Sequence, residues 1–102
     1  LGVVPVAPYA IPGTQEVPDS VAPFAKDYNC CLLSFHGALT WGADLMQAYY
    51  RMEALEHFAM IYTRTKYVMH NTRFMSAEQM DSCISIRSSI GVTSGGIPSN
   101  RT

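Results

Sequence analysis

The order of the expected elements predicts an α/β or α+β layered domain, in which short strands pack against helices. Three observations support this fold class. Short apolar runs in the first half of the chain are too brief for helices. Apolar residues recur at helical spacing over residues 44–66, and a capping sequence at Ser76 begins a last helix. With 102 residues, the chain has room for one domain at most.

The N-terminal segment predicts a strand, a turn and a helix. Residues 3–9 form an apolar run whose prolines confine it to the edge or the end of a sheet, because proline donates no hydrogen bond. A turn at residues 12–14 leads into a helix over residues 15–27, which Thr14 is placed to cap. Pro23 should kink or delay this helix.

The middle of the chain predicts two short strands and the longest helix. Residues 30–35 and 38–41 are the strands, and His36 marks the break between them. Residues 44–66 predict the helix, with Asp44 as its cap. Its apolar face is wider than one stripe, which is typical of a helix buried on two sides; the residues that widen it are Met46, Tyr50, Ala54, Phe58 and Ile61.

The last helix begins at a capping box formed by Ser76 and Gln79, and Gly91 is a natural stop for it. The sequence beyond this glycine is rich in Gly, Ser and Pro. We therefore expect residues 1–91 to form the folded portion and residues 92–102 to be a disordered tail. The chain begins inside an apolar run and without an initiator methionine, so we expect a piece of a longer domain.

Charge and composition argue against several classes of protein. The net charge is −1, and Lys and Arg are scattered, so we expect no nucleic-acid partner. No apolar run approaches the length that spans a bilayer, so we expect no membrane partner. We also expect no secretory signal, because the sequence shows no basic segment followed by an apolar one. The three cysteines form no CxxC pair and predict reduced core residues in a cytoplasmic protein.

His36 is the first candidate for chemistry, because it stands between two apolar strands and before a glycine. A lone histidine is more often a core or capping residue than a metal ligand, and catalytic zinc needs at least three protein ligands. The other histidines, His57 and His70, form no His-x-His or HExxH motif. Spacing alone leaves both interpretations of His36 open and supports no self-contained metal site.

Two carboxylates and three tyrosines of the long helix also have the residue types of a catalytic site. Glu53 and Glu56 share a helix face, but this spacing is common, and we expect surface charge. Tyr49, Tyr50 and Tyr62 predict core aromatic side chains rather than a proton relay.

Three sequence blocks resemble the class II aldolase/adducin family. The first is the strand and turn VPVAPYA–PGT, residues 4–10 and 12–14. The second is LLSFHGALTWG, residues 32–42, which is similar to the family's "LL..HG....G". The third is a helical pattern similar to "A....E.LE..A", formed by Ala48, Glu53, Leu55, Glu56 and Ala59. In this order the blocks resemble the C-terminal half of the family's domain.

The resemblance implies a three-layer α/β/α domain with a mostly antiparallel central sheet. It also implies a homotetramer with active sites at subunit interfaces, acting on a small phosphorylated sugar or aldehyde. The implied reaction is aldol cleavage of a substrate such as fuculose 1-phosphate. By the same resemblance His36 is the third ligand of a Zn²⁺ ion, whose other ligands and acid–base glutamate lie upstream of this chain.

One position departs from the family pattern. The family's catalytic tyrosine before a glycine near the C-terminus corresponds to Ile90, which has no proton to donate. Epimerase, decarboxylase or dehydratase chemistry on the same scaffold therefore stays open. A non-enzymatic, adducin-like interaction domain also stays open. The 102-residue chain alone is expected to be inactive, because one histidine does not hold catalytic zinc.

Overall fold

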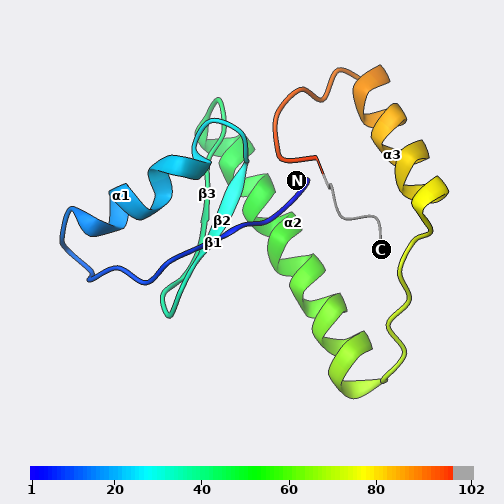
Figure 1. Ribbon diagram of the computed structural model, residues 1–102, viewed down its shortest axis with the longest axis horizontal. Coiled ribbons are helices and arrows are strands. Elements are labelled where there is room, and N and C mark those ends of the chain that lie inside the picture. The colour runs from blue at the N-terminus through cyan, green and yellow to red at the C-terminus, as the bar shows by residue number, and fades with distance from the viewer. Residues whose placement is uncertain (98–102) are drawn as a thin grey trace.

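The computed structural model describes residues 1–97 and has an α/β fold with three α-helices and a small sheet (Figure 1). Its α-helices and strands are, in chain order, β1 (Val6–Ala7), α1 (Glu16–Val21), β2 (Cys30–Leu33), β3 (Gly37–Thr40), α2 (Leu45–Thr63) and α3 (Ala77–Ser89). A 3-10 turn (Ala22–Phe24) follows α1, and a π-helical turn (Arg64–Val68) follows α2. Each expected helix and strand therefore has a counterpart, although the boundaries differ.

The three strands form a mixed sheet in the order β1-β2-β3. β1 runs parallel to β2, with Val6 opposite Leu32, whereas β2 and β3 form an antiparallel hairpin with Leu33 opposite Gly37. β1 lies at the edge of this sheet, as its prolines predicted. It is only two residues long and has a proline on each side, neither of which has an N–H to donate to the ladder, although the Pro5 carbonyl oxygen accepts from the Leu32 N–H at 2.9 Å.

The first helix is shorter than the sequence predicted. α1 ends at Val21, and the chain continues as a 3-10 turn that contains Pro23. The kink expected at this proline is therefore confirmed. The Thr14 hydroxyl accepts a hydrogen bond from the backbone N–H of Glu16 at 3.3 Å, although Gln15 holds the N-cap position.

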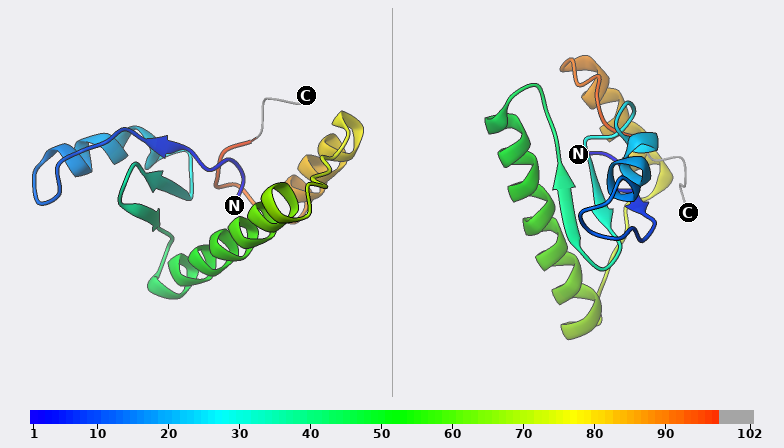
Figure 2. Two further views of the ribbon diagram at one scale, coloured as in Figure 1. Left: turned by 90° about the horizontal axis from the view of Figure 1, so that it is seen from below. Right: turned by 90° about the vertical axis from the view of Figure 1, so that its left-hand side faces the viewer.

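α2 begins where the sequence predicted and lies along β3 (Figure 2). Asp44 Oδ1 accepts a hydrogen bond from the Gln47 backbone N–H at 2.8 Å, which confirms the predicted cap. Only Leu55 of this helix is buried. Tyr49 and Tyr50 are 53% and 59% exposed, so the prediction that they are core residues was wrong for these two.

α3 begins at the predicted capping box. The Gln79 N–H donates to Ser76 Oγ at 3.2 Å, and the Ser76 N–H donates to Gln79 Oε1 at 2.9 Å. The helix stands away from the sheet, and the chain after it turns back toward the N-terminus (Figure 1). Among the described residues, no helix is long and apolar enough to cross a membrane.

A loop over residues 92–97 follows α3, where the disordered tail was expected to begin. Arg87 donates hydrogen bonds to the carbonyl oxygens of Ser94, Gly95 and Gly96. The Val3 N–H donates to the Gly96 carbonyl oxygen at 2.9 Å and forms a β-bridge. The rest of the expected tail, residues 98–102, lies outside the described residues.

The buried core is small. Its apolar members are Ala7, Ala10, Cys30, Cys31 and Leu55. Cys83 is exposed, which differs from the core position expected for the cysteines. The chain exposes 7565 Å², whereas a compact monomer of its 11.3 kDa exposes about 5,700 Å². Large apolar side chains contribute to this exposed area, for example Phe35, Leu45 and Phe74, which are 93%, 83% and 76% exposed.

Candidate functional site

The candidate site lies at the end of the sheet that the carboxyl ends of β1 and β2 share. Because these strands are parallel, the chain leaves β1 after Ala7 and leaves β2 after Leu33 at the same end of the sheet. Tyr9 and Ala10 follow the first strand, and His36 follows the second. Residues at the carboxyl ends of parallel strands lie in the position that α/β proteins commonly use for ligands.

The turn between β2 and β3 fixes the position of His36. The His36 N–H donates to the Leu33 carbonyl oxygen at 3.0 Å and closes the turn. Phe35 has a φ of 64°, in the left-handed region that non-glycine residues rarely adopt. The Ser34 hydroxyl donates to the Ala7 carbonyl oxygen at 2.7 Å, which ties the turn to the end of β1. Ser34 is thus a structural residue in this turn.

The imidazole of His36 is exposed but oriented by the segment after β1. Its Nε2 lies 2.9 Å from the carbonyl oxygen of Ala10. A carbonyl oxygen only accepts, so Nε2 carries the hydrogen and donates it. The neutral ring then has its lone pair on Nδ1. The Tyr9 ring lies beside the imidazole, with 5.5 Å between centroids and 33° between planes.

This ring has the properties of a metal ligand. Histidines that bind metal generally donate their second ring N–H to a carbonyl or carboxylate group, which selects the tautomer and holds the ring. The Ala10 carbonyl does this for His36, and Nδ1 has a lone pair to offer. A single imidazole thus fits as one ligand of a metal such as zinc.

The other histidines do not join His36. His57 lies within α2, and His70 lies beyond the π-helical turn with a φ of 51°. Within residues 1–97, no group of three or more His, Cys, Asp or Glu side chains is close enough to hold a metal ion. The described part of the chain therefore offers His36 as one candidate ligand and no complete set of ligands.

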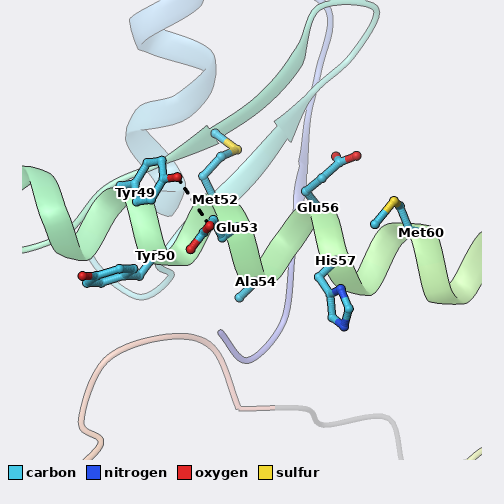
Figure 3. A pocket seen from close by; sticks show the side chains of 8 residues that line it. All are labelled: Tyr49, Tyr50, Met52, Glu53, Ala54, Glu56, His57 and Met60. Carbon is cyan, nitrogen blue, oxygen red and sulfur yellow. Dashed lines mark hydrogen bonds between the residues drawn. The ribbon is translucent and has the colours of Figure 1, made fainter.

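A second group of polar side chains lines a hollow along α2 (Figure 3). Glu53, Glu56 and His57 are exposed there. The Tyr49 hydroxyl donates to Glu53 Oε1 at 3.4 Å. Figure 3 shows that Tyr50 and His57 point to one side of the helix and Glu56 to the other. The glutamates are surface charges, as expected.

Ile90, which the resemblance equated with the family's tyrosine, is the C-cap residue of α3 and is 70% exposed. Its side chain offers no proton, so that residue carries no acid–base role in this chain.

Sequence reasoning missed the contacts that orient His36. The Ala10 carbonyl is a backbone group and leaves no residue signal in a sequence. Tyr9 was assigned only to the first strand, because nothing local indicates that it meets a ring 27 positions later.

Comparisons with known proteins place the chain in a family. The family described as Class II Aldolase and Adducin N-terminal domain matches residues 1–63. The chain therefore belongs to this family, as its three sequence blocks suggested. No solved structure matches the chain.

Curated relatives include enzymes with different reactions. A 3-oxo-tetronate 4-phosphate decarboxylase of Escherichia coli (strain K12) is 36% identical over 61 residues, which are 60% of this chain and 29% of the relative. A rhamnulose-1-phosphate aldolase of Bacteroides thetaiotaomicron is 30% identical over 80 residues, 78% of this chain and 29% of the relative. An L-fuculose phosphate aldolase of Escherichia coli is 31% identical over 77 residues, 76% of this chain and 36% of the relative. The chain thus spans about a third of the length of these relatives.

Proposed function

We propose that the chain is part of a metal-dependent, lyase-type enzyme that cleaves a carbon–carbon bond in a small sugar phosphate. The names of the relatives support this class, since aldolases and decarboxylases both break such a bond and the named compounds are phosphorylated. The proposal includes a cytoplasmic location and a three-layer domain of which this chain is the C-terminal portion.

The observation that carries the proposal is the hydrogen bond from His36 Nε2 to the Ala10 carbonyl oxygen, 2.9 Å long. It fixes the tautomer that leaves Nδ1 as the donor atom for a metal. When bound, a zinc ion at this position would polarise a substrate oxygen as a Lewis acid. The remaining ligands would come from residues beyond those described here.

The side chains around His36 hold this ring rather than react. Tyr9 packs beside the imidazole and limits its rotation. Phe35 is 93% exposed and contacts Tyr9 edge-on, with 6.0 Å between ring centroids. These two rings form an apolar wall beside the imidazole, which suits a site that excludes water when the rest of the protein covers it.

The same proposal includes a homo-oligomer, such as a tetramer. Large apolar side chains along α2, among them Met46, Tyr50, Phe58 and Ile61, are about half exposed or more. Contiguous apolar surface of this kind marks contact regions in soluble proteins. Further residues of the natural chain or a second copy would cover this face.

The test measures carbon–carbon bond cleavage by the natural polypeptide that contains these residues. We expect it to cleave fuculose 1-phosphate, rhamnulose 1-phosphate or a 3-oxo-tetronate phosphate, and a chelator should abolish that activity. His36→Ala should lower kcat/KM by at least about 100-fold with an unchanged circular dichroism spectrum, whereas His57→Ala should keep activity. Activity that resists both the chelator and His36→Ala would overturn the proposal. A folded polypeptide without activity and without metal would favour an adducin-like interaction domain.

A further inference from the structure

Phe35 is the most exposed large apolar side chain of the described residues. Its side chain is 93% exposed, so burial contributes almost nothing to keeping a phenylalanine at this position. It stands in the turn between β2 and β3, directly before the candidate metal ligand His36. A single exposed apolar residue is ordinary in proteins, so exposure alone assigns no role to this ring.

The backbone of Phe35 adds a second unfavourable feature. Its φ of 64° lies in the left-handed region, which glycine and asparagine adopt far more readily than a bulky residue does. Neither the exposure of the side chain nor the backbone conformation therefore favours phenylalanine over a small polar residue in this turn. Strained residues of this kind are concentrated at active sites and in the segments that hold ligands.

Hydrogen bonds on both sides of Phe35 hold the strained turn in place. The N–H and the hydroxyl group of Ser34 both donate to the Ala7 carbonyl oxygen, at 3.3 and 2.7 Å. The His36 N–H donates to the Leu33 carbonyl oxygen at 3.0 Å. Backbone strain persists where the surrounding contacts fix the conformation, as they do here. The turn therefore presents the ring of Phe35 from a defined position next to His36.

The ring of Phe35 belongs to a group of three neighbouring rings that includes the imidazole. Its centroid lies 6.0 Å from that of Tyr9, edge to face, and the Tyr9 centroid lies 5.5 Å from that of His36. Tyr9 is itself 57% exposed. A Cβ at Gly37 would have no neighbouring atom within 4 Å, so the turn borders open space. A ligand bound at His36 would therefore have two exposed aromatic rings beside it.

We propose that Phe35 determines specificity at the proposed metal site, and that its ring contacts a methyl-bearing end of the substrate's carbon chain. This inference rests on the proposed function, because it needs a small sugar phosphate bound at His36. The Phe35 ring has no group that could bond a hydroxyl. A substrate hydroxyl held against it would lose its contact with water without gaining a partner. A methyl group in the same place has no such loss and buries apolar area.

This contact selects among the compounds of the proposed function. Fuculose 1-phosphate and rhamnulose 1-phosphate are 6-deoxy sugars, so the end opposite their phosphate group is a methyl group. A 3-oxo-tetronate phosphate carries a charged carboxylate at the end opposite its phosphate group. The ring of Phe35 would disfavour that carboxylate even more strongly than a hydroxyl, because a charge loses more on leaving water. The substrate class is therefore a 6-deoxyketose 1-phosphate.

Fluorine NMR of the natural polypeptide, labelled with fluorophenylalanine, reports directly on this ring. The signal that is missing from Phe35→Leu belongs to Phe35. The ligands are a 6-deoxyhexitol 1-phosphate and the hexitol 1-phosphate of the same configuration, which differ by one hydroxyl group. Neither has a carbonyl group, so neither can undergo aldol cleavage and the readout does not depend on activity. We expect the 6-deoxy compound to shift the Phe35 signal saturably and to bind at least ~10-fold more tightly. A Phe35 signal that neither compound shifts, or equal affinity for the two, would overturn the proposal.

Variants assign the preference to this ring, and calorimetric titration with both compounds measures it. Phe35→Asn keeps a residue that tolerates the left-handed conformation but removes the apolar ring, so the preference should fall to ~3-fold or less. Phe35→Leu keeps an apolar side chain and should keep most of the preference. Phe74→Asn removes a phenylalanine that is 76% exposed between α2 and α3, and should leave the preference unchanged. An undiminished preference in Phe35→Asn would contradict the assignment. Metal content should be equal in all these variants.

Cleavage assays separate the failure of this inference from the failure of the proposed function. Cleavage with equal kcat/KM for 6-deoxy and 6-hydroxy ketose phosphates would leave the proposed function standing and overturn the role of Phe35. Selective binding of the 6-deoxy compound without cleavage of any substrate would support the role of Phe35 and count against the lyase reaction. A lower melting temperature of Phe35→Asn, together with an unshifted Phe35 signal, would show that the ring packs against protein instead of substrate.

Discussion

The Nε2–H of His36 donates to the carbonyl oxygen of Ala10 at 2.9 Å and joins residues 26 positions apart. This contact depends on the parallel pairing of β1 with β2, which brings the carboxyl ends of both strands to the same end of the sheet.

The first prediction concerns the backbone strain at Phe35. Its φ of 64° costs about 1–2 kcal/mol for an L-residue, and glycine has no such cost. Phe35→Gly should therefore be more stable than Phe35→Ala by about 1 kcal/mol, since both lose the ring contact with Tyr9. Urea unfolding of the two variants measures the difference. Equal stability would show that the turn relaxes out of the left-handed conformation.

The second prediction concerns the capping box of α3. Ser76→Ala removes the acceptor for the Gln79 N–H and should lower the free energy of unfolding by about 1 kcal/mol. Ser85→Ala, in the exposed middle of the same helix, is the matched control and should be neutral or slightly stabilising. Thermal unfolding of both variants checks this. A loss in Ser85→Ala as large as in Ser76→Ala would contradict the capping role.

The third prediction concerns the loop held by Arg87. Arg87→Ala removes hydrogen bonds to three carbonyl oxygens and should destabilise the chain by about 1–3 kcal/mol. It should also speed proteolytic cleavage within residues 92–97. Arg73→Ala, an exposed arginine outside this loop, should have no effect on either property. Unchanged cleavage in Arg87→Ala would show that the guanidinium does not hold the loop.

The fourth prediction concerns the buried thiols. Burial raises the pKa of the Cys30 and Cys31 thiols. Thiols of the unfolded chain ionise with the usual pKa of about 8.5, and at that pH the two buried thiols of the folded chain stay protonated. Their contribution to stability is complete below that pH and is lost as the pH rises above it. The midpoint of urea unfolding should therefore fall between neutral and alkaline pH. This fall should be smaller in the double variant Cys30→Ala, Cys31→Ala than in Cys83→Ala, which keeps both buried thiols.

The fifth prediction concerns the uncovered face of α2. The isolated chain should self-associate through Met46, Tyr50 and Ile61, which lie on one face of the helix and are 53%, 59% and 47% exposed. Ile61→Glu should shift the sedimentation profile toward monomer. Ile86→Glu on α3 introduces the same charge elsewhere and should leave association unchanged. A monodisperse monomer of the unaltered chain in sedimentation would be inconsistent with this account.

Local chemistry made several elements predictable. Asp44 and the pair Ser76 and Gln79 cap their helices through contacts within three residues, which a sequence displays directly. Pro23 likewise ends α1 through its own ring. The family resemblance was recognisable because its residues are contiguous blocks.

Other features depend on contacts between distant residues. The hydrogen bond from His36 to Ala10 and the exposure of Tyr50 follow from how strands and helices pair. The burial of Asn29 involves the loop after α3, whose Gly95 lies so close that a Cβ there would be 2.5 Å from Asn29 Nδ2. The periodicity of α2 predicted a helix buried on two sides, but it could not show that, among residues 1–97, Leu55 is the one residue of this helix that is buried.

The metal content of the natural polypeptide that contains this chain tests the central claim most directly. Elemental analysis of the purified protein, His36→Ala and His57→Ala compares a proposed ligand with a histidine outside the site. We predict one divalent metal per chain in the unaltered protein and in His57→Ala, and at least a ~10-fold loss in His36→Ala. Equal metal content in all three proteins would contradict the assignment of His36 as a ligand.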